Sequence, residues 1–197
     1  MRKVDFNNVI ESTKAEGKRL GAGNYVCKIT DIEDFEAKEY VRILVDITEG
    51  EFAGHFSDNY FESRPSRHAV YLSYKQTAEG MLKKRLSTIT ECNPGFDAMS
   101  TFNGAVKNPT VLAMFLGKYV GVCMDEEEYE SLDGETRTGI KMGNLVTVSS
   151  IHDGTALPPR HKKLDGTWVS LEEAAKEKAA AEAAKAAKAV SDDEIPF

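Results

Sequence analysis

The chain has 197 residues, of which 41% are hydrophobic, and a formal net charge of −7. This length allows one sizeable domain with appendages, and the acidic charge argues against a protein that coats duplex DNA by bulk positive charge. The three cysteines are far apart and form no Cys-x-x-Cys pair. We therefore expect free thiols in a reducing compartment, with neither a zinc ribbon nor a disulfide framework.

The first half of the chain predicts a β-meander after a short arm. Residues 1–23 are charged and weakly periodic, and we expect an N-terminal arm there. Residues 24–32 alternate between apolar and polar side chains, as a half-buried strand does. Alternation is clearer in residues 40–49, where four branched aliphatic residues point one way. A third strand is predicted over residues 52–61.

Helical signals follow. Ser73 and Gln76 have the spacing of a capping box, and an apolar helical repeat continues up to a turn at residues 93–95. A second short helix is predicted with Asn108 as its N-cap and Gly117 just past its end. These two helices interrupt the series of strands.

Strands resume at residues 119–124 and 142–151, and we interpret the polar residues 125–139 between them as a solvated turn. The order is three strands, a helical insertion and two strands. This order predicts a mainly β fold with a helical insertion, specifically a five-stranded barrel of the oligonucleotide-binding (OB) type. We assign this domain to residues 24–153.

The rest of the chain reads as appendages. Residues 154–170 form a connector, with a small hairpin that places Trp168. A capping box opens residues 171–190, whose interior apolar side chains are all Ala. Such a Glu/Lys/Ala segment is typical of a spacer that is flexible or helical, because it has no apolar stripe to pack. Residues 191–197 form an acidic tip.

The tip has the composition of a peptide that another protein holds. Its partner-binding residues are Asp192, Asp193, Glu194, Ile195, Pro196 and Phe197. Basic groups and an apolar pocket on a partner would suit these carboxylates and the final aromatic ring. The tip resembles the C-terminal end of bacterial and phage single-stranded DNA-binding proteins, whose acidic tails end in Asp-Asp-hydrophobic-Pro-Phe-type sequences. The motif covers six residues of 197. The predicted strand order is similar to that of phage members of this family, which are often OB folds with insertions.

This resemblance implies a function. The body would bind and protect single-stranded DNA during replication, recombination or repair, and the tip would recruit replication, recombination or repair proteins. It implies the cytoplasm of a bacterial cell, including one infected by a phage. No apolar run approaches the ~20 residues of a membrane span and the histidines are scattered, so we expect no membrane, metal or cofactor. The lack of any apolar stretch after Met1 to Asp5 agrees with a protein that carries no signal peptide.

Binding of single strands without sequence preference needs cations for phosphates and aromatic faces for bases. Residues 63–78 fit best, because they contain arginines and tyrosines but no acid. The outer face of strands two and three is the usual nucleic-acid surface of OB folds. Together these considerations predict a set of nucleic-acid-binding residues: Lys28, Tyr40, Arg42, Phe56, Tyr60, Arg64, Arg67, Tyr71, Tyr74 and Lys75. Phe56 and Tyr60 fit a core position equally well.

Other classes of function find less support. The acidic run at residues 125–128 has the composition of a metal-dependent nuclease site, but adjacent carboxylates at a strand end point in different directions. Because no P-loop or nucleophile motif occurs either, we expect no enzyme and no catalytic residue. The remaining alternative is an interaction decoy, which would capture host repair or replication proteins through its tip without binding DNA.

Overall fold

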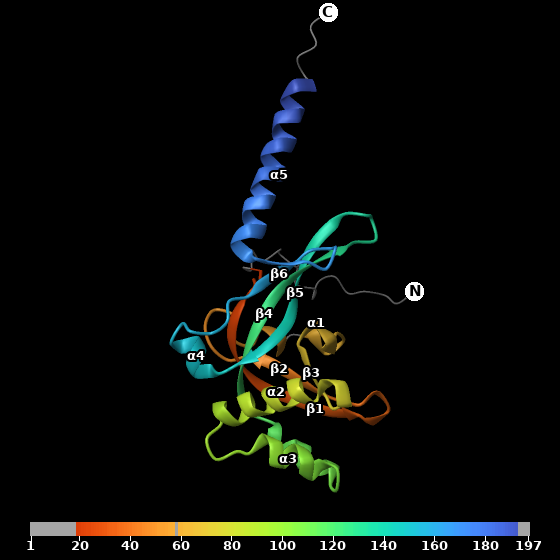
Figure 1. The fold of residues 1–197 in the computed structure, drawn as a ribbon, viewed down its shortest axis with the longest axis vertical. Helices are drawn as coiled ribbons and strands as arrows, with labels where there is room; N and C mark the ends of the chain where they lie inside the picture. The colour runs from red at the N-terminus through yellow and green to blue at the C-terminus, as the bar shows by residue number, and fades with distance from the viewer. Residues whose placement is uncertain (1–18, 58, 193–197) are drawn as a thin grey trace, which may run out of the picture.

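The computed structural model describes residues 19–57 and 59–192, and across them seven strands form one mostly open sheet within a mixed α/β architecture (Figure 1). The strands are β1 (Gly23–Phe35), β2 (Tyr40–Ile47), β3 (Ala69–Ser73), β4 (Tyr119–Glu130), β5 (Thr136–Val146), β6 (Arg160–Lys162) and β7 (Trp168–Ser170). Their order is β3-β2-β1-β4-β6-β7, and β5 pairs with β4. All pairs are antiparallel except β4 with β6. The tip from Asp193 to Phe197 and most of the predicted arm lie outside the described residues.

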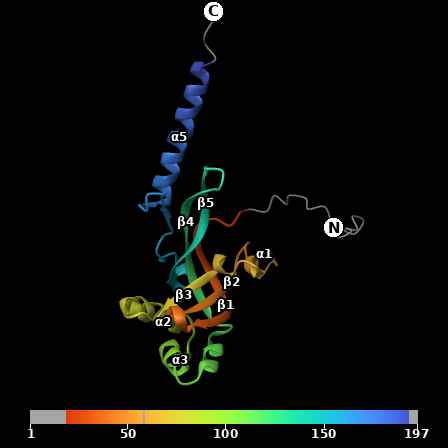
Figure 2. The same ribbon diagram turned by 90° about the vertical axis from the view of Figure 1, so that its right-hand side faces the viewer.

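Helices flank both sides of this sheet. The α-helices are α1 (Asn59–Glu62), α2 (Glu79–Cys92), α3 (Ala98–Ala105), α4 (Val148–His152) and α5 (Leu171–Asp192). The 3-10 turns are η2 (Glu36–Lys38), η3 (His55–Ser57), η4 (Pro65–Arg67), η5 (Gln76–Ala78) and η6 (Pro109–Phe115). Helix α2 lies on one side of β1–β3 and α1 on the other, while α5 extends away from the body (Figures 1 and 2). No helix in the described part of the chain is long and apolar enough to cross a membrane.

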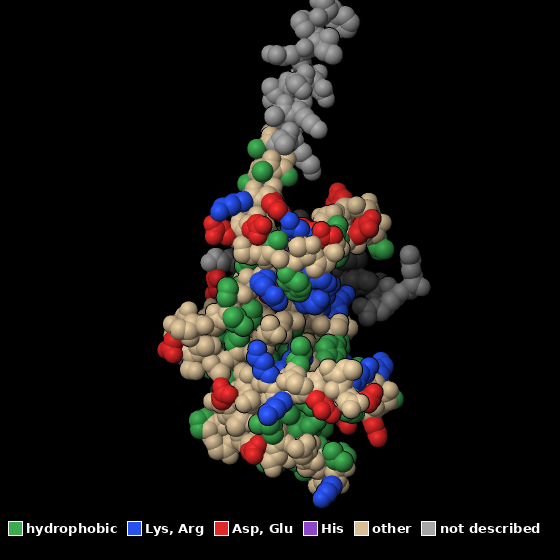
Figure 3. Space-filling model, in the orientation of Figure 1, with side chains coloured by type: hydrophobic (Ala, Val, Ile, Leu, Met, Phe, Trp, Pro, Cys, Tyr) green, Lys and Arg blue, Asp and Glu red, His purple; other side chains and the backbone are tan. Residues whose placement is uncertain are grey.

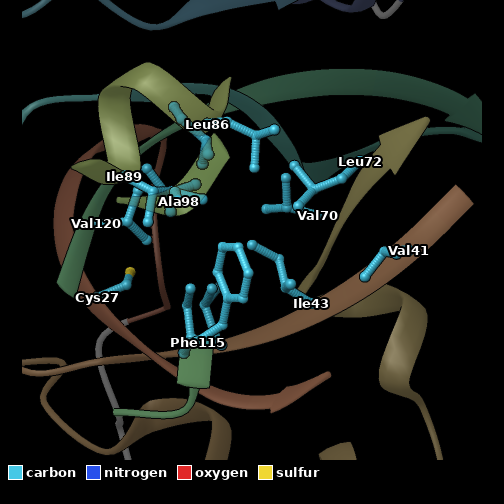
Figure 4. Packing of buried hydrophobic residues seen from close by; sticks show 14 of the residues in the cluster. Cys27, Val41, Ile43, Val70, Leu72, Leu86, Ile89, Ala98, Phe115 and Val120 are labelled. Carbon is cyan, nitrogen blue, oxygen red and sulfur yellow. The ribbon is translucent and has the colours of Figure 1, made fainter. Parts of the chain in front are cut away.

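The first two strands are where the alternation predicts them. Val41, Ile43, Val45 and Ile47 are at most 2% exposed and share the inner face of β2. They pack with the buried side chains of β3, α2 and η6, among which Phe115 occupies the centre of the core (Figure 4). The hydrophobic effect, at roughly 25 cal/mol per Å² of buried apolar surface, makes this layer the main stabilising element of the fold.

The predicted third strand at residues 52–61 is wrong. This segment forms η3 and α1, because the buried carboxylate of Asp46 accepts hydrogen bonds from Phe56 N (2.8 Å) and from the Ser57 hydroxyl. These bonds hold the segment in a short helical turn above the end of β2. The real third strand is β3, within residues 63–78, where the sequence predicts nucleic-acid-binding residues but no strand.

The helical insertion is confirmed, with one addition. Helix α2 ends at Cys92, directly before the predicted turn. Asn108 caps η6 by accepting a hydrogen bond from Thr110 N at 3.3 Å, as predicted. Helix α3 is additional, and Asp97 caps it by accepting from Ser100 N at 3.0 Å.

The predicted closed barrel does not form, since no ladder joins β3 to β5 in the described part of the chain. Arg85 of α2 instead donates a hydrogen bond to the Tyr71 carbonyl of β3. An arginine side chain thus binds a backbone acceptor on the strand that a closed barrel would pair with β5. The fold is β-rich, as expected, but the sheet stays open.

The predicted turn at residues 125–139 is also wrong. Strands β4 and β5 run through it as a long hairpin that turns at residues 131–135. The predicted strand at 142–151 ends early, since α4 begins after Thr147, whose hydroxyl accepts from Ser150 N at 3.2 Å. The hairpin projects beyond the rest of the sheet (Figure 1).

The connector contributes to the same sheet. Its predicted hairpin is confirmed as β6–β7, with the turn at Asp165 and Gly166, whose φ is +87°. Strand β1 pairs with β4 as far as Met124, and β6 pairs in parallel with Glu126 and Glu127 of β4. Strand β6 therefore continues the sheet along the edge of β4 that β1 occupies before it. Helix α5 then starts with the predicted cap, in which Glu173 N donates to the Ser170 hydroxyl at 3.1 Å.

Candidate nucleic-acid interface

Aromatic rings gather on the outer face of β1, β2 and β3. The register places Phe35 opposite Tyr40 and Arg42 opposite Tyr71, so these four side chains emerge on one face of the sheet. The ring centroids of Phe35 and Tyr40 lie 5.0 Å apart, and those of Tyr40 and Tyr71 lie 5.1 Å apart. We call Phe35, Tyr40, Arg42 and Tyr71 the ring face.

The cation of the ring face is held by two neighbours. The guanidinium of Arg42 lies 4.9 Å from the centre of the Phe35 ring, and its Nη2 donates to Glu33 Oε2 at 2.5 Å. The Glu33 side chain is 51% exposed. The Arg42 side chain is only 19% exposed, so the pair is open to solvent mainly on the carboxylate side, and a competing anion would approach Arg42 from there.

The turn between β1 and β2 sets this register. Residues Glu36–Lys38 form a 3-10 turn that brings Phe35 back opposite Tyr40. Glu39 closes the turn with φ +57°, in the left-handed region. Its carbonyl accepts a hydrogen bond from Tyr74 N at 3.0 Å, which ties the turn to the end of β3. The three strands of the ring face are therefore fixed relative to one another at this end.

Three predicted residues form a second group on α1 and η4, before β3 begins. The Arg64 guanidinium lies 4.1 Å from the Tyr60 ring centre and donates to the Tyr60 carbonyl at 3.1 Å. Arg67 lies beside the β4–β5 hairpin, since its Nη1 is 4.0 Å from the position that a Cβ on Gly139 would take. Tyr60, Arg64 and Arg67 are all exposed.

Two predicted stacking residues are packed instead. Phe56 is 7% exposed, and its ring stacks on buried His68 at 5.2 Å, so the core interpretation holds and its ring is not available to bases. Tyr74 packs against the core near Phe102, and its hydroxyl donates to Asp34 Oδ1 at 3.1 Å. Desolvation and this hydrogen bond raise the pKa of Tyr74 to about 12. Neither ring belongs to the ring face.

The two predicted lysines lie at separate places. Lys28 is exposed on β1, opposite Asp46 and Tyr119, and Lys75 is exposed after the end of β3. On the face seen in Figure 3, Lys and Arg side chains gather across the middle, while above and below them acidic and basic side chains are mixed.

The acidic run on β4 is engaged rather than solvated. His161 of β6 is 5% exposed and lies between two carboxylates, with Nδ1 3.1 Å from Glu126 Oε2 and Nε2 3.2 Å from Glu128 Oε1. We call these three residues the His161 clasp. It fastens the parallel strand β6 to the hairpin.

The other two carboxylates of the run bind the same segment. Asp125 is buried and accepts a hydrogen bond from Arg160 N at 2.7 Å. Glu127 accepts from Lys162 at 2.6 Å and from Lys141 at 3.0 Å, and these hydrogen bonds lower its pKa. Among residues 19–57 and 59–192, no group of three or more His, Cys, Asp or Glu side chains is arranged to hold a metal ion.

Two residues here were not predicted from the sequence. They are Phe35, a member of the ring face, and Glu33, the carboxylate partner of Arg42. The available signal was the alternation of β1, which continues past residue 32 up to the turn. It is obscured because a bulge between Ile29 and Asp31 shifts the register by one residue, and so reverses which side chains face outward.

Comparisons with known proteins add no family assignment. No family model matches the chain, and no curated protein is similar to it at a significant level.

Proposed function

We propose that this chain binds and protects single-stranded DNA through its ring face, during replication, recombination or repair, and recruits partner proteins through its acidic tip. The observation that carries the proposal is the contact set of three aromatic rings and an arginine on one outward face of β1–β3. Base stacking on such rings contributes about 1–3 kcal/mol per base and tolerates any sequence. Tyr71 is 39% exposed, so part of its ring surface is open to a base.

The strand pairing supports an OB-type body. The pairs β3–β2, β2–β1, β1–β4 and β4–β5 are those that an OB barrel contains, and α2 follows β3 in the chain as the helix of that fold does. We propose that the body is an open OB-type barrel, whose closing pair β3–β5 is replaced by contacts through α2. In this fold the ring face coincides with the usual nucleic-acid surface.

Fluorescence anisotropy of a labelled thymidine oligomer tests the DNA-binding half. The wild-type protein should bind, with a slope of log affinity against log salt of about −0.7 for each phosphate contacted. The variant with both Tyr40→Ala and Tyr71→Ala should lose about 100-fold in affinity, which corresponds to one modest stacking contribution for each ring.

Trp168→Ala is the matched control for this double variant. Trp168 is also an exposed ring beneath an arginine, with Arg160 4.4 Å from its centre, but it lies on β7, across the sheet from the ring face. Its removal should leave DNA affinity unchanged. If the wild-type protein ignores single strands at low salt, the proposal fails, and the decoy function becomes the better interpretation.

The recruitment half needs a separate measurement. Helix α5 holds the beginning of the tip away from the sheet (Figure 1). Removal of residues 192–197 should leave affinity for single strands equal or higher and abolish capture of replication or repair proteins by the immobilised protein. A large loss of DNA affinity in the truncated protein would contradict this division between body and tip.

A further inference from the structure

A hollow of about 630 Å³ opens between the α1–η4 segment and the β4–β5 hairpin. We call it the side groove, and its polar and aromatic walls are Arg19, His55, Tyr60, Phe61, Arg67 and Tyr129. None of the described residues that line it is Asp or Glu. The protein has a net charge of −7, so a hollow whose described lining contains two arginines and no acid differs in charge from the molecule as a whole. Such a site favours an anionic ligand.

The hairpin wall presents an aromatic ring in a fixed position. Tyr129 of β4 packs over Gly139 of β5, where an added Cβ would lie 3.2 Å from Tyr129 Cε1. Arg67 Nη1 reaches to 4.0 Å from that same point, so the ring and the guanidinium lie side by side. Tyr129 remains 43% exposed. The absence of a side chain at position 139 therefore lets the ring approach the hairpin this closely.

The opposite wall and the end of the groove complete the arrangement. Tyr60 is 52% exposed, and its ring is oriented by Arg64. Arg19 is anchored to the hairpin, because its guanidinium donates to the Thr138 carbonyl. Phe61, packed edge-to-face against Tyr60 at 5.0 Å, supplies an apolar surface. The groove thus combines ring faces with arginines, which is the chemistry that binds a base together with its phosphate.

We infer that the side groove is a second binding site for the same single strand, which it takes up after the strand leaves the ring face. This inference rests on the proposed function. Arg67 ends η4 two residues before β3 begins, and Tyr71 lies in β3, so the Cα atoms of the two residues are at most about 14 Å apart. A strand on the ring face therefore needs only a few more nucleotides to place a base near Tyr129 and a phosphate near Arg67.

Oligomers of two lengths test the inference, one of about 5 and one of about 12 thymidines, within the range of site sizes known for OB folds. Tyr129→Ala should lower affinity for the longer oligomer about tenfold and leave affinity for the shorter one within about twofold. Arg67→Ala should reduce the salt slope for the longer oligomer by about 0.7, the value for one lost phosphate contact. Tyr129→Phe should restore wild-type affinity, because it keeps the ring.

Trp168→Ala again serves as the control, since its ring lies on the opposite edge of β4. Unchanged affinity of Tyr129→Ala and Arg67→Ala for the longer oligomer would overturn the side groove while leaving the ring face intact. An equal loss for both lengths would overturn it as a separate site. Displacement of the longer oligomer by free thymidine monophosphate at equal nucleotide concentration would make it a mononucleotide site instead. Failure of the wild-type protein to bind either oligomer would instead contradict the proposed function itself.

Discussion

The ring face and the His161 clasp belong to one sheet but differ in what their polar groups contact. In the clasp, both ring nitrogens of a buried histidine meet carboxylates of the neighbouring strand. On the ring face, one exposed carboxylate, Glu33, binds Arg42, and the rings are partly open to solvent. The dense acidic run therefore fastens β6 to β4. The sparser set of rings and one cation instead forms the exposed surface at which we propose that single-stranded DNA binds. The number of charges in a stretch of sequence does not reveal which of the two it will be.

The largest expected effect would break the clasp. His161→Ala leaves Glu126 and Glu128 without the ring between them, in a partly buried setting. Loss of one partner from a buried polar network costs about 2–4 kcal/mol in the free energy of unfolding. Urea unfolding followed by circular dichroism measures this loss. DNA affinity should not change, because the clasp lies away from the ring face.

His152→Ala is the matched control, since His152 also pairs with a glutamate, Glu49, at 2.9 Å but is about half exposed. An exposed pair contributes little, so this variant should stay within about 0.5 kcal/mol of the wild type. Equal stability losses in the two histidine variants would show that burial does not distinguish the clasp from a surface ion pair.

A smaller effect is expected on the ring face. Glu33→Gln removes the charge that competes with phosphate for Arg42 and should raise affinity for a thymidine oligomer about two- to fivefold at low salt. The gain should disappear at high salt, where the pair is screened. Glu91→Gln, an equal change of net charge at an exposed site on α2, controls for general charge. The same gain in both variants would mean that Glu33 does not compete for Arg42.

The smallest effect concerns Tyr74, which follows β3 and packs against the core near Phe102. Its pKa is about 12 in the folded protein against an ordinary value of 10.0. Between these values the unfolded state binds fewer protons than the folded state, so the free energy of unfolding falls as pH rises from about 10 to about 12. The stabilisation is fully present below pH 10.

Urea unfolding at a series of alkaline pH values should show a shallower fall in Tyr74→Phe than in the wild type. Burial also raises the pKa of Tyr25, but Tyr25 is present in both proteins, so the comparison isolates Tyr74. An identical pH dependence in the two proteins would mean that Tyr74 is as solvated as the rings on the outer face.

The sequence predicts the parts of this fold that local chemistry determines. Alternation locates β1 and β2, and the caps at Asn108 and Ser170 locate the starts of η6 and α5. These features depend on neighbours a few residues apart. Pairing over long distances decides the rest, and no local pattern encodes it.

Several of the failures share one physical cause. The sequence of residues 125–128 is typical of a solvated turn. Their partners His161 and Lys162 lie on β6, 35 residues later in the chain. Phe52, Phe56 and Tyr60 recur every four residues, a spacing that fits both one face of a strand and one face of a helix. Tyr129 and Arg19 enter the side groove only because the hairpin carries them beside η4. In each case a distant segment supplies the partner that settles the local structure.

Under the proposed function, the length of helix α5 would limit how far a recruited protein can move from the body. Its 22 residues at about 1.5 Å each give a tether of about 33 Å, semi-rigid because it is rich in Ala, Glu and Lys. A molecule captured at its far end would share a small volume with the body, at a local concentration that short tethers bring to the millimolar range. A partner protein that binds the tip only weakly would then rebind close to the same stretch of DNA after each dissociation.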